Sequence, residues 1–270
     1  MPLAVCATPI GNLEDVTLRV LTELREADLI LCEDTRHTRV LLERHGVSWR
    51  RLMSYHEHNE ARRTRDVLER LAAGTRIALV SDAGLPGISD PGARLVAAAL
   101  EAGQDVTVLP GPSAVETALV ASGFAAERYQ FGGFLPRRAA ELDALWRELS
   151  HWRHAYVAFE SPQRLSRSLA GLALAFPDRE VAVCRELTKR FEEVARGPAR
   201  EVALRFGDGV KGEITLVIGP FAGSSAAGDD EEAVEAVGEL VAAGAARGAA
   251  ADVVSRLTGI SRNRLYRASL

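Results

Sequence analysis

The stretch Ser81-Asp82-Ala83-Gly84-Leu85-Pro86-Gly87-Ile88-Ser89-Asp90-Pro91-Gly92 decides the fold of this 270-residue sequence. It follows an apolar, β-rich run at Ile77–Ser81 and precedes a helical pattern at Pro91–Ala102. This order places a long turn at the carboxyl end of a strand. Glycines allow a backbone to approach a ligand closely, and prolines fix its path. In open α/β sheets, such strand ends are where ligands bind.

Two further turns of similar composition follow predicted strands. Thr8–Leu13 (TPIGNL) comes after the first strand, and Pro110–Ala114 (PGPSA) comes after the fifth. Three such turns from one sheet would form a crevice whose donors and acceptors are mostly main-chain groups. That crevice suits a zwitterionic, adenine-bearing ligand better than a polyphosphate, which would require more cations. The alternative is a set of ordinary surface turns, which the length and composition of residues 81–92 disfavour.

The rest of the chain alternates between strand-like and helix-like patterns, which predicts an α/β fold with sheets covered on both faces. The predicted strands are Leu3–Ala7, Leu29–Cys32, Leu52–His56, Ile77–Ser81, Val106–Leu109, Tyr129–Leu135, Ala155–Phe159, Val181–Arg185 and Ile214–Ile218. The predicted helices are Val16–Arg25, Thr38–Arg44, Glu60–Ala72, Pro91–Ala102, one from Ser113, Glu141–Leu149, Arg164–Ala175, Glu231–Ala243, Ala249–Leu257 and Arg262–Ala268.

The predicted domain boundaries fall at breaks in this alternation. Pro110-Gly111-Pro112 separates an N-terminal α/β domain, 1–112, from a second α/β domain, 113–222. Phe221–Asp230 is small, polar and linker-like, so residues 223–270 are predicted to be a linker and a small helical tail. Its three short helices and basic end are typical of a helix-turn-helix unit or of a plain capping bundle.

Composition excludes several classes of protein. The chain is 47% hydrophobic and has no apolar run long enough to cross a bilayer, and we expect its first residues to form a strand rather than a secretory signal. Cys6, Cys32 and Cys184 are unclustered, which predicts buried thiols in a reducing cytoplasm and no metal site. The G-x-G-x-x-G fingerprint, the P-loop and the G-x-S-x-G elbow are all absent from the sequence.

Positive charge is concentrated in two segments of a chain whose net charge is −4. Residues 36–70 contain nine arginines and five acids, and residues 247–270 contain five arginines and one acid. Such local excesses, with Tyr55, His56 and His58 inside the first, are typical of surfaces that contact RNA phosphates and splayed bases. Solvated helix faces are the alternative interpretation.

Several blocks of the sequence resemble one known family. The strings TPIGNLEDVTLR, CEDTRHT, YHEHNE, SDAGLPGISDPG, FESPQR, RELTKRFEE and KGEITLVIGP occur in the order found in the ribosomal RNA small subunit methyltransferase I family. That family is a branch of the tetrapyrrole methylase superfamily, and the blocks cover nearly all of residues 3–220. The helical tail is similar to the small helical domain that many members carry.

The resemblance implies an architecture, a cofactor and a substrate. It implies two α/β domains of the tetrapyrrole methylase type (class III methyltransferase), with S-adenosyl-L-methionine in the cleft between them. It also implies 2′-O-methylation of a cytidine in the decoding region of small-subunit ribosomal RNA, a homodimer, and no DNA or membrane partner. The cofactor-binding residues that it implies are Pro9, Ser81, Asp82, Ala83, Gly84, Ile88, Ser113, Ala114, Phe159, Glu160, Ala182, Gly212 and Glu213.

The catalytic candidates lie beyond strand ends near the expected cleft. We predict that Asp34 or His56 removes a proton from, or orients, the ribose hydroxyl. Arg36 and Lys189, one of only two lysines in the chain, would hold phosphate or stabilise negative charge. For each of these residues a structural salt bridge, such as one between Arg36 and Glu33, is the alternative.

Two other functions remain open at this point. One is a methyltransferase of the same fold that acts on a tetrapyrrole or another small molecule or protein. The other is a non-enzymatic RNA-binding factor for ribosome assembly whose cofactor pocket is vestigial. The arginine-rich segments argue for RNA over the former, and the complete set of Gly/Pro turns argues against the latter.

Overall fold

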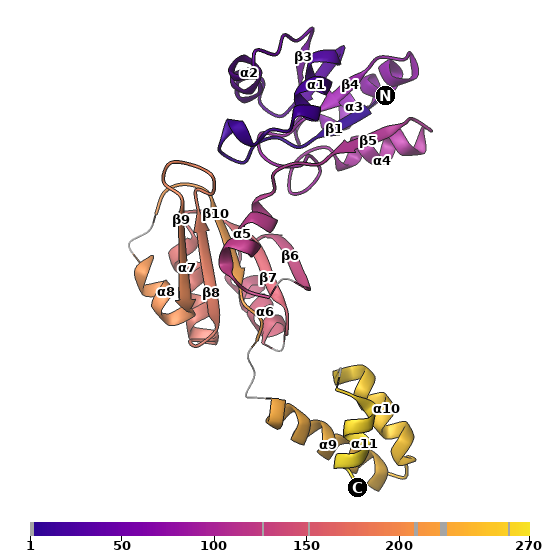
Figure 1. Ribbon diagram of the computed structural model, residues 1–270, viewed down its shortest axis with the longest axis vertical. Coiled ribbons are helices and arrows are strands. Elements are labelled where there is room, and N and C mark those ends of the chain that lie inside the picture. The colour runs from indigo at the N-terminus through magenta and orange to yellow at the C-terminus, as the bar shows by residue number, and fades with distance from the viewer. Residues whose placement is uncertain (1–2, 126, 151, 208–209, 222–225, 259) are drawn as a thin grey trace. The chain divides into compact units, whose positions relative to one another are not determined.

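The computed structural model describes residues 3–125, 127–150, 152–207, 210–221, 226–258 and 260–270. Residues 1–220 form one compact unit that contains two five-stranded sheets, and residues 221–270 form a second, helical unit (Figure 1). The predicted α/β class is therefore confirmed.

The first sheet is entirely parallel, with the strand order β3-β2-β4-β1-β5. Parallel strands need crossover connections, and the helical patterns between them supply these. The strands are β1 (Leu3–Cys6), β2 (Leu29–Cys32), β3 (Leu52–Ser54), β4 (Ile77–Leu79) and β5 (Val106–Leu109). The connecting segments are a 3-10 turn η1 (Leu13–Asp15) and the helices α1 (Leu18–Glu26), α2 (Thr35–Arg44), α3 (Glu60–Ala72) and α4 (Ala93–Glu101).

Alternate residues of these strands pack against different helices. Ala4 and Cys6 share a core with α1 and α2, whereas Leu3 and Val5 share one with α3 and α4. Because successive strand side chains point to opposite faces, α1 and α2 cover one face and α3 and α4 cover the other. All three cysteines are free and buried, as predicted.

Two helices begin at positions that the hydrophobic pattern alone did not identify. Thr17 caps α1 by accepting a hydrogen bond from the backbone N–H of Val20. Asp34 caps α2 by accepting one from the backbone N–H of Arg36, so this helix begins at Thr35 rather than at the predicted Thr38.

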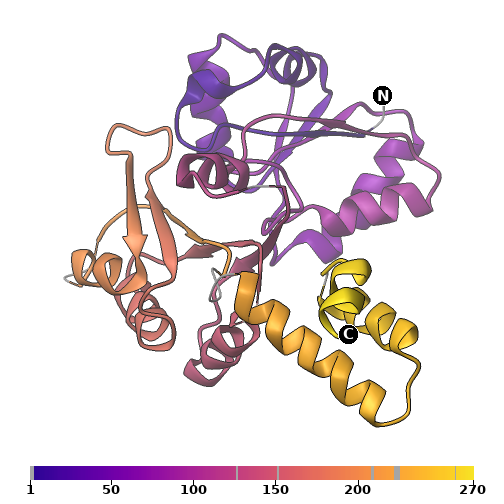
Figure 2. The ribbon, with the colours of Figure 1, turned by 60° about the horizontal axis from the view of Figure 1, so that its bottom comes forward.

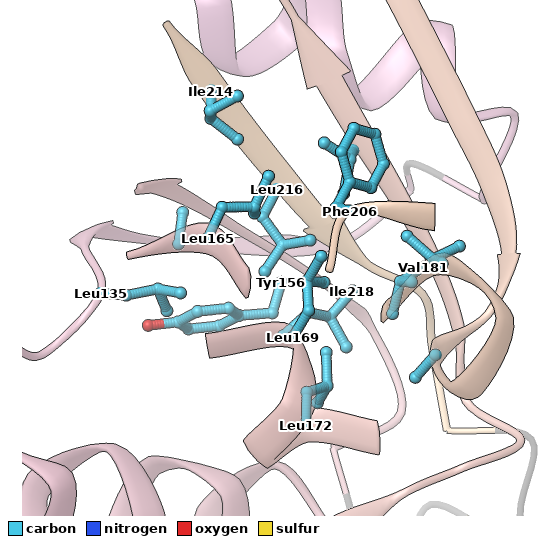
Figure 3. Close-up of a cluster of buried hydrophobic side chains, with 14 of the residues drawn as sticks. Leu135, Tyr156, Leu165, Leu169, Leu172, Val181, Phe206, Ile214, Leu216 and Ile218 are labelled. Carbon is cyan, nitrogen blue, oxygen red and sulfur yellow. The ribbon is translucent and has the colours of Figure 1, made fainter. Parts of the chain in front are cut away.

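The second sheet is mixed, with the order β6-β7-β10-β8-β9, and only its β6–β7 pair is parallel. Its strands are β6 (Tyr129–Phe134), β7 (Ala155–Glu160), β8 (Glu180–Arg185), β9 (Glu193–Pro198) and β10 (Ile214–Ile218). Its helices are α5 (Ala114–Ser122), α6 (Ala139–Leu149), α7 (Leu165–Ala175) and α8 (Ala199–Arg205). Helices α6, α7 and α8 pack on one face, through the cluster drawn in Figure 3, and α5 packs on the other.

Strand β9 and helix α8 were missing from the sequence-based prediction. Strand β9 has the sequence Glu-Val-Ala-Arg-Gly-Pro, and its last two residues, Gly197 and Pro198, are typical of a loop rather than of a strand. It lies at the sheet edge beside β8, where proline is tolerated, and α8 follows it at once.

The C-terminal unit consists of α9 (Ala226–Ala242), α10 (Arg247–Thr258) and α11 (Arg262–Ala268). Figure 2 shows α9 as the longest of the three, and Val237, Ala251 and Leu265 lie in their shared core. Helix α9 begins inside the range that we predicted to be a linker, Phe221–Asp230, whose residues 222–225 lie outside the described part of the chain. Among the described residues, no helix combines the length and apolar character needed to span a bilayer.

Candidate active site

A cavity of about 670 Å³ lies within the first unit, where loops of the two sheets meet. The first sheet contributes the turns after β1, β4 and β5, which are the three turns singled out from the sequence. The second sheet contributes the ends of β6, β7 and β8, the start of β10, and helix α5. The residues that line the cavity are Ile10, Asp82–Leu85, Ile88–Asp90, Pro110–Glu116, Phe134, Phe159–Pro162, Cys184, Leu187 and Gly212–Thr215.

The turns after β1 and β4 hold each other in place. Thr8 and Gly84 form an antiparallel bridge, with N–H···O distances of 2.8 and 3.0 Å in the two directions. The Ser81 hydroxyl donates to the carbonyl oxygens of Ala83 and Gly84. Main-chain pairing thus fixes the backbone that faces the cavity.

Gly11 allows a loop of the second sheet to approach the turn after β1. A Cβ atom at Gly11 would lie 2.5 Å from Cγ of Lys189 and 2.9 Å from the carbonyl oxygen of Leu187. The backbone N–H of Asn12 donates to Thr188 Oγ1 at 3.0 Å. Glu186 and Thr188 adopt positive φ angles of 52° and 65° in this loop. Only glycine leaves room for this contact between the two halves of the site.

Lys189 connects this loop to the start of β10. Its Nζ lies 2.9 Å from Glu186 Oε1 and 3.0 Å from Glu213 Oε2. Burial would lower the pKa of Lys189, but its bonds to Glu186 and Glu213 outweigh burial and raise it. Gly212, at φ 99°, packs against Glu186, and a Cβ atom there would lie 2.5 Å from Glu186 Cγ. Lys189 therefore lies beside the cavity wall rather than on it.

The charge of the cavity is one-sided. Five acidic residues line it, namely Asp82, Asp90, Glu116, Glu160 and Glu213. No lysine, arginine or histidine lines it among the residues that the structure describes. Phe134 and Phe159 add an aromatic wall, with ring centroids 5.5 Å apart. A ligand that combines a flat apolar ring system with positive charge fits this lining, and a polyphosphate does not.

Two of these acids have their own hydrogen-bond partners. Glu116 accepts hydrogen bonds from Ser113 and Tyr129; burial would raise the pKa of Glu116, but these bonds lower it. The Glu160 side chain is 0% exposed, pairs with Arg164, and accepts a hydrogen bond from Ser168. Both carboxylates shape the wall.

Asp90 has fewer partners than these two: among the described residues no cation pairs with it, and Ser81 is its one side-chain hydrogen-bond partner. Burial raises the pKa of Asp90 to about 6; Glu33 and Asp82 add to the shift, and a hydrogen bond from Ser81 opposes it. Burial and then Asp82 also raise the pKa of Glu33, which follows β2. Sequence reasoning did not single out Asp90, although Ser89-Asp90 repeats the Ser81-Asp82 pair in the same turn.

Ten of the thirteen predicted cofactor residues line the cavity, and three lie behind its wall. Pro9 is buried in the turn after β1, Ser81 holds the loop carbonyls, and Ala182 packs in the core beneath α5. The ten residues that line the cavity are Asp82, Ala83, Gly84, Ile88, Ser113, Ala114, Phe159, Glu160, Gly212 and Glu213.

The predicted catalytic residues Asp34 and Arg36 pair with each other rather than lining the cavity. Arg36 Nη2 lies 2.5 Å from Asp34 Oδ2, so the salt bridge that we suggested for Arg36 forms with Asp34 and not with Glu33. The hydrogen bonds from Arg36 lower the pKa of Asp34. Asp34 is linked to the cavity through Asp82, whose Oδ1 accepts a hydrogen bond from the Asp34 backbone N–H at 3.1 Å. As a helix cap already paired with a guanidinium, Asp34 is a poor proton acceptor.

His56 is held by Asn59. Asn59 Oδ1 accepts from the backbone N–H of His56 at 3.0 Å, and Nδ2 donates to the carbonyl oxygen of Ser54 at 3.3 Å. These contacts fix the amide orientation, so Nδ2 is also the donor toward His56 Nε2, 2.9 Å away. In the neutral ring the proton is then on Nδ1, which is buried and has no hydrogen-bond partner. Through Nδ1, neutral His56 is a donor rather than a base.

The arginines of residues 36–70 do not form one patch. Helix α2 lies on one face of the first sheet and α3 on the other. Within α2 and the loop after it, Arg36, Arg44 and Arg50 pair with Asp34, Glu14 and Asp28. The excess of positive charge on the α2 side is thus smaller than the sequence count suggests. On the α3 side, Arg62 and Arg65 are exposed.

Comparison with known proteins gives one family. The chain matches the Tetrapyrrole (Corrin/Porphyrin) Methylases over residues 2–203. It is 41% identical to "Ribosomal RNA small subunit methyltransferase I" of Mesorhizobium japonicum, covering 98% of this chain and 90% of that protein. It is 42% identical to the protein of the same name from Micromonospora olivasterospora, covering 98% and 85%.

Solved structures share the fold at lower identity. The methyltransferase CobJ superposes with a TM-score of 0.63 and 21% identity, covering 82% of this chain and 94% of that chain. The uroporphyrin-III-C-methyltransferase of Thermus thermophilus gives a TM-score of 0.56 and 20% identity, covering 80% and 93%. These likenesses show the fold alone.

Proposed function

The chain belongs to the tetrapyrrole methylase family and, within it, to the ribosomal RNA small subunit methyltransferase I family, and on that premise we propose its reaction. It is a methyltransferase that uses S-adenosyl-L-methionine, and its substrate is small-subunit ribosomal RNA. The methyl group goes to the 2′-oxygen of a cytidine in the decoding region.

The observation that carries this proposal is the one-sided charge of the cavity. S-Adenosyl-L-methionine carries a sulfonium and an ammonium group against one carboxylate, so it has a net positive charge. Five acidic side chains and no described cation line the space, which favours that charge over an anionic nucleotide. The apolar part of the lining also fits the cofactor, because Phe134 and Phe159 offer aromatic surface against which an adenine ring could pack.

The chain's own residues position, enclose and order the reactants. When bound, the cofactor supplies an electrophilic methyl group. The turn at 81–92 is held by main-chain bonds between Gly84 and Thr8, and the turn at 110–114 leads directly into helix α5 through the bond from Thr117 to Ser113, so both would hold a ligand at low entropic cost. The loop at 186–192 packs on Gly11, and its Leu187 lines the cavity, so this loop would help to shield a bound cofactor from water.

The decisive experiment is methylation of purified small ribosomal subunits with tritiated cofactor. We expect label in RNA that survives protease, and mass mapping is expected to place it on a cytidine ribose. Label in protein or in a tetrapyrrole, with none in RNA, would favour the small-molecule or protein alternative. Thermal stabilisation by the cofactor separates an enzyme from a vestigial pocket, because a ligand bound only by the folded state raises the midpoint.

The remaining predictions concern assembly and location. We propose a homodimer, a cytoplasmic location with the ribosomal subunits, and no DNA partner. We also propose that residues 1–112 and 113–222 act as two α/β domains with the cavity between them, and that 223–270 is an accessory helical unit. Light scattering of the full chain tests the dimer.

A further inference from the structure

The reaction of the proposed function needs a group that accepts the ribose proton, and none of the predicted residues supplies one. Asp34 caps a helix and pairs with Arg36. His56 presents a protonated nitrogen. A ribose hydroxyl is a weak nucleophile at neutral pH, so a base close to the cofactor's methyl group would accelerate transfer.

The cavity narrows the choice among its five carboxylates, because four already hold partners. Asp82 accepts from the Asp34 backbone and contacts His37, and Glu213 pairs with Lys189. Glu116 and Glu160 hold the partners described above. Asp90 shares only the Ser81 hydroxyl, which also donates to two loop carbonyls. It is thus the cavity carboxylate with most acceptor capacity left.

The backbone beside Asp90 supports this choice. Ser89 has a φ of 61°, one of three positive values among non-glycine residues in the described chain. Such strain is concentrated at functional sites, where the surrounding structure maintains it. Here it turns the chain between Ile88, which is half-exposed, and Asp90, so that both line the cavity.

We propose that Asp90 is the catalytic base of this methyltransferase, an inference that rests on the proposed function. The ribose oxygen forms a bond to the methyl carbon as the carbon–sulfur bond breaks, and its electron pair remains on sulfur in S-adenosylhomocysteine. The hydroxyl proton passes to the Asp90 carboxylate, which later releases it to water. Among the described residues its charged and titratable neighbours are the acids Glu33 and Asp82, with no cation. Burial first, and then these two acids, keep the carboxyl a better proton acceptor than an exposed aspartate.

The test compares full-length wild type with Asp90→Asn, Asp90→Glu and the control Asp143→Asn, which removes an exposed carboxylate of α6 outside the cavity. Single-turnover methylation of small ribosomal subunits is measured at saturating cofactor from pH 5 to 8, and cofactor affinity is measured by calorimetry. We expect Asp90→Asn to slow methylation about 100-fold, the scale of a lost general base, with cofactor affinity within about threefold. The wild-type rate should fall about tenfold per pH unit below the Asp90 pKa, and Asp90→Asn should lose this dependence.

The remaining outcomes separate the competing explanations. Asp90→Glu should keep the acid limb at a rate about tenfold lower, and this result stands in should the asparagine variant not fold. A wild-type rate in Asp90→Asn overturns the inference. So does lost cofactor affinity with a full rate at saturation, because Asp90 would then be a cofactor ligand. A wild type that binds cofactor but labels no RNA overturns the proposed function itself, whatever the variants do.

Discussion

The cavity and the arginine-rich segment 36–70 organise charge in opposite ways. The cavity gathers five acids around one space and pairs only some of them with cations. Seven of the nine arginines of the segment lie on α2 and α3, which cover opposite faces of the first sheet, and the other two lie in the loop before β3. Three of the nine pair with acids. The contrast teaches that the cavity concentrates negative charge around one space, which favours a single positively charged ligand, whereas the segment spreads its positive charge over separate surfaces.

The largest effect on stability should come from breaking an ion pair in the cavity wall, compared with breaking one on the surface. Arg164→Met leaves the fully buried Glu160 carboxylate without its cation, and we expect a loss of about 3–5 kcal/mol in the free energy of unfolding. The control, Arg138→Met, breaks a surface pair whose arginine is 84% exposed, and it should cost less than about 1 kcal/mol. Urea denaturation measures both. Equal losses would mean that the wall charge is no better shielded from water than the surface pair.

The next effect tests whether the close packing of the cavity wall serves ligand binding. Gly212→Ala adds a Cβ atom within 2.7 Å of three Glu186 atoms at a positive φ of 99°. We expect a destabilisation of about 2 kcal/mol and about tenfold weaker cofactor binding.

Gly103→Ala provides the matched control for this substitution. Gly103 also has a positive φ, 68°, but a Cβ atom there meets nothing within 4 Å, and the residue lies outside the cavity. Its substitution should carry the backbone penalty alone and leave cofactor affinity unchanged in calorimetry. An equal loss of affinity in both variants would contradict a local role for Gly212.

The sequence predicts features that depend on local backbone rules, and it does not predict features that depend on contacts between distant side chains. The cavity turns were identifiable because glycine, proline and strand ends impose local backbone rules at residues 8–13, 81–92 and 110–114. Asp90, the Lys189–Glu213 pair and the separation of α2 from α3 depend on side chains that meet only after the sheet has formed. Strand β9 was not predicted for a related reason: its ending at Gly197 and Pro198 is tolerated only because the strand lies at the edge of the sheet.

A smaller effect separates the stability of the cavity from its function. Burial raises the folded-state pKa of Asp90 to about 6, above the ordinary aspartate value of 3.8, so folding favours the protonated form. The folded protein then binds more protons than the unfolded chain between these values, and stability falls as the pH rises through that window. Asp90→Asn removes this loss. After discounting for partial solvent screening, we expect the variant to be about 1 kcal/mol more stable at pH 7.5 and no more stable at pH 3.5.

Urea titrations at the two pH values measure this difference, with Asp143→Asn as the control that should show no pH-dependent gain. A destabilised Asp90→Asn at pH 7.5 would show that the ionised carboxylate stabilises the loop, and the cavity would then not be electrostatically strained.

The arginine segment should show a weaker, salt-dependent effect. Arg62→Gln with Arg65→Gln removes two exposed charges from α3, and we expect about fivefold weaker binding to small ribosomal subunits at low salt. The slope of log affinity against log salt concentration should fall in magnitude by roughly 1.5, because two phosphate contacts that release counterions on binding are no longer made. Arg25→Gln on α1, outside the segment, is the control. An unchanged salt slope would remove α3 from the RNA-binding surface.

The smallest effect is spectroscopic, and it decides whether His56 or Asp90 is the better candidate for the base. His45 serves as the reference ring. His45 Nε2 lies 2.8 Å from the carbonyl oxygen of Leu13, which can only accept, so the proton of neutral His45 is on Nε2. His56 Nε2 faces the Asn59 amide donor instead, so its proton is on Nδ1. Nitrogen-15 NMR at neutral pH should therefore report opposite tautomers for the two rings. Asn59→Asp replaces the donor with an acceptor and should convert His56 to the Nε2–H form. If wild-type His56 already has that form, Nδ1 is a free acceptor, the predicted role of His56 in proton removal is restored, and the reaction no longer requires Asp90 as its base.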